Sequence, residues 1–215
     1  MTTFLLNPYD AELDLTNKDD RKLFQDASKG LTAKEEIFDG KKENFSKFPK
    51  LLSKEFDDIR VTECLVIPTS WHATGTAAER RTPLPAGIVD IFKSHKVEQP
   101  MIKQYSDLVW SDASIGDTTK LFDIFETPPA STAELITLSN KRRLKHVMLG
   151  NKLWNSLSPN FKLELAVNEA AFKVRREYDG PLLWDHIRRR VNPTTTVGAS
   201  RFKEQLETIT LSEYN

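Results

Sequence analysis

Residues Ser131–Val191 read STAELITLSNKRRLKHVMLGNKLWNSLSPNFKLELAVNEAAFKVRREYDGPLLWDHIRRRV, and this stretch decides the fold class. Apolar residues recur in it at three- and four-residue spacing, which is the spacing of one face of an α-helix. Ser131 followed by Glu134 has the pattern of a capping box at a helix N-terminus. Proline in a first turn marks two further helix starts, at Ser158-Pro159 and Gly180-Pro181. The stretch therefore predicts three consecutive helices.

Each predicted helix has an apolar face that we expect to be buried. The expected inner positions are Leu144, Val147, Met148, Trp154 and Leu157 in the first helix, Leu163, Val167, Ala170 and Val174 in the second, and Leu183, Trp184, Ile187 and Val191 in the third. Gly150 inside the first helix costs roughly 1 kcal/mol against Ala, which indicates a bend or a close helix contact. Short loops between amphipathic helices favour antiparallel packing. The predicted fold is mainly α, a multi-helix bundle.

The first half of the chain is less regular. Helices are expected at about 19–29, 46–59 and 97–110, a helical turn at 121–125, and a last helix at 199–209. Pro49 is tolerated in the second of these because a start at Ser46 places it in the first turn. Residues 61–67 fit either a buried strand or a helical extension, and a long irregular loop is expected at about 68–92. Thr127-Pro128-Pro129 predicts a boundary between subdomains 1–130 and 131–215.

The composition is that of a globular protein, with 39% hydrophobic and 29% charged residues among 215. No apolar run approaches the ~18–20 residues that a membrane span needs. The acidic first residues lack the basic region of a signal peptide. A lone Cys64 excludes an intrachain disulfide and a cysteine-based zinc site, and it suits a reducing compartment. We therefore expect a cytoplasmic protein with no membrane partner.

Motifs of catalysis are missing from the sequence. The four histidines, His72, His95, His146 and His186, contain no i, i+4 pair for a metal, and there is no nucleophile elbow, P-loop, dinucleotide fingerprint or aspartic-protease triplet. Cys64 lies in an apolar run, so we expect it to be buried and unreactive. The sequence predicts no enzymatic activity, no cofactor, no metal and no small-molecule substrate.

Basic residues gather in the second half, and the charge is uneven along the chain. Residues 1–131 hold 17 Lys/Arg and 22 Asp/Glu, whereas residues 132–215 hold 14 and 9. The candidate nucleic-acid-binding residues are Lys141, Arg142, Arg143, Lys145, Arg188, Arg189 and Arg190, and a further cluster is Lys173 with Arg175-Arg176. Phosphate binding needs several charges on one face, while solvated helix ends need none, and both interpretations remain open. The asymmetry also allows head-to-tail attraction between copies.

Several segments resemble the Gag proteins of copia-type LTR retrotransposons. The most specific runs from Asp179-Gly180-Pro181 through Leu183-Trp184 and Arg190-Val191-Asn192-Pro193 to Val197-Gly198. A weaker match is Phe38-Asp39-Gly40 followed by Asn44-Phe45, where two extra residues and Pro49 depart from the family pattern.

The resemblance implies an all-α, capsid-like structural protein that self-assembles through helical surfaces around element RNA, without catalytic residues. It predicts a homo-oligomer with RNA as a possible partner. Because relatives continue beyond the last helix, it also predicts that this chain is a truncated copy, incomplete at its C-terminus. The alternative from the residues alone is a helical nucleic-acid-binding or adaptor module that uses the basic second half.

Overall fold

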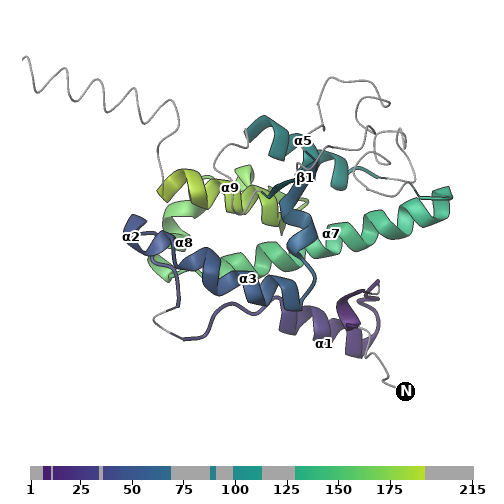
Figure 1. Ribbon diagram of the computed structural model, residues 1–215, viewed down its shortest axis with the longest axis horizontal. Coiled ribbons are helices and arrows are strands. Elements are labelled where there is room, and N and C mark those ends of the chain that lie inside the picture. The colour runs from purple at the N-terminus through teal and green to yellow at the C-terminus, as the bar shows by residue number, and fades with distance from the viewer. Residues whose placement is uncertain are drawn as a thin grey trace, which may run out of the picture.

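The computed structural model describes residues 7–10, 12–33, 36–68, 88–90, 99–112 and 129–191, and these residues are mainly helical (Figure 1). The helices are α1 (Lys18–Ala27), α2 (Lys42–Phe45), α3 (Phe48–Asp58), α5 (Gln99–Val109), α7 (Thr132–Asn155), α8 (Pro159–Ala166) and α9 (Gly180–Val191), with 3-10 turns η1 (Pro8–Asp10), η2 (Thr62–Leu65) and η3 (Glu169–Ala171). The strands are β1 (Val66–Pro68), β2 (Ile88–Asp90), β3 (Lys173–Val174) and β4 (Glu177–Tyr178). The predicted mainly α class is confirmed.

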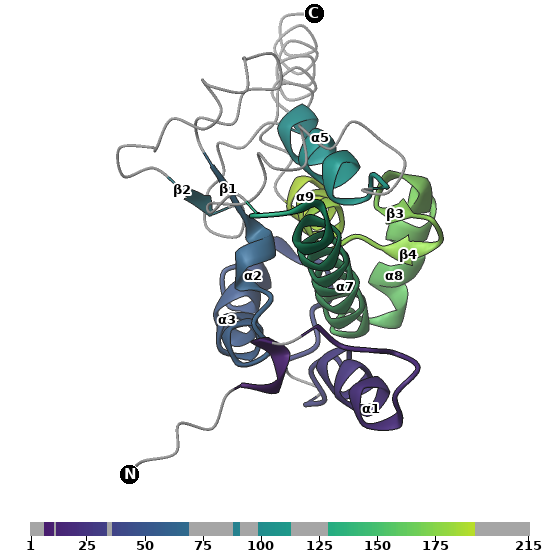
Figure 2. The ribbon, with the colours of Figure 1, turned by 90° about the vertical axis from the view of Figure 1, so that its right-hand side faces the viewer.

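The long helix α7 is the centre of the arrangement. Figure 2 looks nearly along it and shows α1, α3, α9 and the β3–β4 hairpin placed around its axis. Its start has the predicted cap, since the Ser131 hydroxyl accepts a hydrogen bond from the Glu134 amide at 3.2 Å. The Glu134 carboxylate in turn accepts one from the Ala130 amide at 2.6 Å.

Helix α9 packs along α7 through a face that the sequence predicted correctly. Its expected inner positions, Leu183, Trp184, Ile187 and Val191, are all buried. Two glycines permit close packing here, Gly180 between α9 and α7 and Gly150 between α7 and strand β4. A Cβ at Gly150 would come within 2.3 Å of the Tyr178 carbonyl oxygen, and one at Gly180 within 2.4 Å of the Leu149 side chain. Gly150 therefore marks a close contact.

The predicted inner face of the second helix is wrong. Helix α8 ends at Ala166, after eight residues, and it buries Phe161 and Leu165. Leu163 and Val167, expected to be inside, are 71% and 82% exposed. Both pairs have the four-residue spacing of a helix face, and the pair containing the aromatic residue is the one that faces the core.

The first half contributes an aromatic cluster to the same core. Phe38 stacks on Phe48 with ring centroids 4.7 Å apart and meets Phe161 edge-on at 5.5 Å, while Phe45 stacks on Trp184 at 5.5 Å. The helix expected at 46–59 is α3, which begins two residues later, at Phe48, and has Pro49 in its first turn as predicted. The short helix α2 precedes it. Elements on both sides of the expected boundary at residue 130 thus share one hydrophobic core.

The ambiguous segment 61–67 contains both kinds of structure, a 3-10 turn η2 followed by strand β1. Strand β1 pairs antiparallel with β2, so Ile88–Asp90 form a strand inside the region that was expected to be an irregular loop. The rest of that loop, the helical turn at 121–125 and the last helix at 199–209 lie outside the described residues.

Candidate functional site

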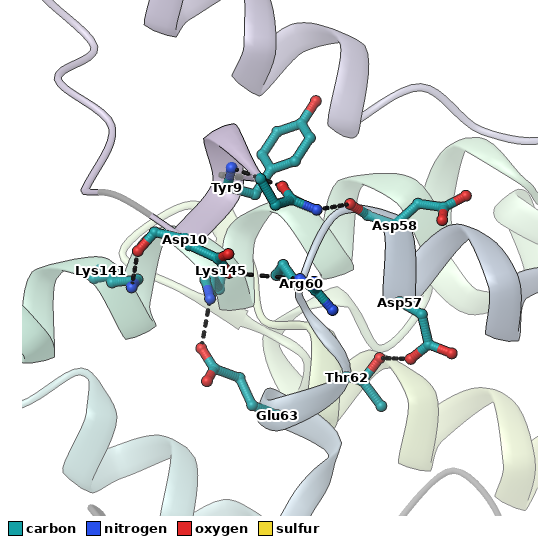
Figure 3. A network of polar contacts seen from close by, with 10 residues as sticks. Tyr9, Asp10, Asp57, Asp58, Arg60, Thr62, Glu63, Lys141 and Lys145 are labelled. Carbon is teal, nitrogen blue, oxygen red and sulfur yellow. Dashed lines mark hydrogen bonds and ion pairs between the residues drawn. The ribbon is translucent and has the colours of Figure 1, made fainter. Parts of the chain in front are cut away.

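Four of the nominated basic residues, Lys141, Arg142, Arg143 and Lys145, lie on α7. The two lysines among them contact carboxylate or carbonyl oxygens from the first half of the chain. Lys145 is only 5% exposed, and its ammonium lies 2.7 Å from a carboxylate oxygen of Glu63. Lys141 donates a hydrogen bond to the backbone carbonyl of Asp10. Figure 3 shows that Lys141 reaches Asp10 in the N-terminal segment and that Lys145 reaches Glu63 of η2. Both ammonium groups therefore make contacts within the protein, and that of Lys145 is buried.

The neighbouring arginines of α7 point to different partners. Arg142 donates to the Tyr105 hydroxyl at 3.0 Å and to the Glu63 carbonyl at 3.3 Å. Arg143 donates through one guanidinium nitrogen to the Asn140 side chain at 2.7 Å, but its Nε is buried without a hydrogen-bond partner among the described residues. Arg142 thus ties α7 to α5 and η2, whereas Arg143 has an unused donor.

The three arginines at the end of α9 pair with acids on their own or the adjacent helix. Arg188 and Arg189 share the carboxylate of Asp185 at 2.8 and 2.7 Å, and Arg190 pairs with Glu164 of α8 at 2.9 Å. Among the seven nominated residues, Lys145 and Arg188 are buried. The contacts gather Lys141, Arg142 and Lys145 near Glu63 and leave the α9 arginines on separate partners. Nucleic-acid binding by these seven residues remains a prediction.

A polar cleft of about 230 Å³ lies beside this network. It is lined by Asp10, Asp57, Arg60, Thr62, Glu63 and Lys145 (Figure 3). The Arg60 guanidinium lies 3.5 Å from the Asp10 carboxylate, and the Thr62 hydroxyl donates to Asp57 at 2.6 Å. Arg60 pairs with Asp10 and Lys145 pairs with Glu63, whereas Asp57 accepts a hydrogen bond from the uncharged Thr62, so the lining holds one more acid than base. The cleft joins the N-terminal segment to α3 and α7.

The most connected polar group in the described core is the carboxylate of Asp179. It accepts hydrogen bonds from the Ser106 hydroxyl at 2.9 Å, the Trp110 indole at 2.7 Å, His146 Nδ1 at 2.8 Å and the Leu182 amide at 2.9 Å. Two donors come from α5 and its end, one from α7, and one from the first turn of α9, which Asp179 caps. We call these residues the Asp179 hub.

The titration of the hub follows from its geometry. Burial alone would raise the pKa of Asp179, but His146 and the other donors hold that pKa below its usual range. Burial lowers the pKa of His146, yet the adjacent Asp179 carboxylate and Cys64 outweigh it, so the imidazole pKa lies well above its usual value. Cys64 is buried and free, as expected. The hub therefore contains an ion pair between Asp179 and His146, and neither side chain is exposed to solvent.

The pKa directions predict how stability depends on pH. The contribution of Asp179 is present above its unfolded pKa near 3.8 and is lost as pH falls through the lower folded value. The contribution of His146 is complete below its unfolded pKa near 6.5 and is lost as pH rises through the higher folded value. We expect the free energy of unfolding, from urea titrations, to fall on the alkaline side. His146→Gln should remove that slope, and an unchanged slope in the variant would contradict the assignment.

Large apolar side chains are exposed on α8 and at the residue that caps its C-terminus. Leu163 and Val167 lie one helical turn apart, and they are 71% and 82% exposed, against 39% for Leu15 and 37% for Leu51. We call this pair the aliphatic ridge. The sequence predicts that both residues lie in the core, whereas the structure places them on the surface.

Comparison with known proteins adds no relative: no protein family, no curated protein and no solved structure matches this chain. Among the described residues, no group of three or more His, Cys, Asp or Glu side chains could hold a metal ion. The described helices include none that is long and apolar enough to cross a membrane. The Gag-like resemblance therefore remains a prediction from sequence.

Proposed function

We propose that this chain is a helical structural protein that self-associates, in the manner expected of a copia-type Gag-like protein that encloses element RNA. The observation that carries the proposal is the aliphatic ridge on α8. Isolated exposed hydrophobic residues are ordinary, whereas Leu163 and Val167 are neighbours, both mostly exposed, and form a small apolar patch that a partner can cover.

The partner that suits the ridge is a second copy of this chain. Its surroundings carry both signs of charge, namely Lys162 beside it and the exposed pair formed by Glu164 and Arg190. Two α8 helices can therefore meet antiparallel, with Leu163 of one copy against Val167 of the other, without opposing only like charges. The −5 and +5 balance of the two halves of the sequence adds attraction between copies.

The size of the ridge sets the expected strength of the contact. A stable dimer interface buries about 800 Å² on each partner, which two side chains cannot supply. A single contact of this size is weak, but several such contacts give stable association when a scaffold keeps many copies at high local concentration. The proposal therefore predicts concentration-dependent association and assembly on a scaffold such as RNA, without a tight dimer.

The test is the oligomeric state of the Leu163→Lys variant. We expect wild-type protein to associate across a series from about 1 µM to 1 mM, measured by sedimentation velocity. Leu163→Lys should weaken that association by about tenfold or more, because burying a leucine contributes roughly 1.5–3 kcal/mol. Leu51→Lys on α3 is the matched control, and it should leave association unchanged.

Two outcomes would reject the proposal. The first is a wild-type protein that stays monomeric at every concentration and forms no particles with RNA under the electron microscope. The second is equal weakening by Leu51→Lys and Leu163→Lys, since that result would reflect general charge repulsion and leave no role for the ridge.

A further inference from the structure

We draw no further inference here: the strongest candidate, the polar cleft where the N-terminal segment, α3 and α7 meet, has one carboxylate, that of Asp57, without a basic partner among the described residues, and it carries no proposal because its one buried lining side chain, Lys145, is already paired with Glu63 and no other feature of the described residues points to a ligand there.

Discussion

Asp179→Ala is expected to lower the free energy of unfolding by roughly 3–5 kcal/mol, which is a large part of the 5–15 kcal/mol typical of a domain. The reason is the number of groups that the carboxylate satisfies. Removing it leaves the Ser106 hydroxyl, the Trp110 indole and the His146 imidazolium buried without an acceptor. Urea denaturation followed by tryptophan fluorescence measures the loss.

The control for this prediction is an acid whose ion pair is exposed. Glu164→Gln breaks the surface pair with Arg190, and it should change stability by no more than about 1 kcal/mol. Asp179→Asn keeps the shape of the side chain and removes its charge. The variant should also be destabilised, because the NH₂ group of the amide would face a pair of donors where the carboxylate has an acceptor oxygen. A loss below about 1 kcal/mol in Asp179→Ala would contradict the central role of the hub.

Gly150→Ala should destabilise the protein by about 1–3 kcal/mol, although alanine is the better helix former by about 1 kcal/mol. The added Cβ would come within 2.3 Å of the Tyr178 carbonyl oxygen, and backbone atoms cannot move aside as a flexible side chain can. The clash would push α7 away from the strand that leads into α9. Thermal unfolding by circular dichroism measures the change.

Thr137→Ala is the companion variant. Thr137 is exposed on the same helix, and its replacement should be neutral or slightly stabilising because only helix propensity changes there. If Gly150→Ala proved as stable as Thr137→Ala, the close approach of α7 to the hairpin would not be a real constraint on the sequence.

The helical framework follows largely from local patterns. The capping residues Ser131 and Ser158 and the buried face of α9 could be predicted because they depend on residues within a few turns of each other. The inner face of α8 could not, because Phe161 with Leu165 and Leu163 with Val167 have the same four-residue spacing. The choice depends on which neighbours meet the helix, and those neighbours are distant in sequence.

The candidate sites depend more strongly on distant contacts. The pairing of Arg188 and Arg189 with Asp185 is visible as three- and four-residue spacing. The partner of Lys145, however, is Glu63, and 82 residues separate them. The sequence marks Arg175 and Arg176 only as part of a basic cluster, and nothing in it reveals that both have a positive φ. Counting charges in the sequence therefore could not show which basic side chains are paired with carboxylates inside the protein.

The Asp179 hub also bears on how the chain acquires its structure during synthesis. Trp110 and Ser106 precede Asp179 by 69 and 73 residues. A ribosome releases the α5 segment long before the acceptor for these donors exists, and α7 emerges with His146 lacking its counter-charge. Until the last described helix begins, these donors keep their hydrogen bonds to water and cannot enter the core. The contacts of this core are thus non-local and form late, after Asp179 has been synthesised.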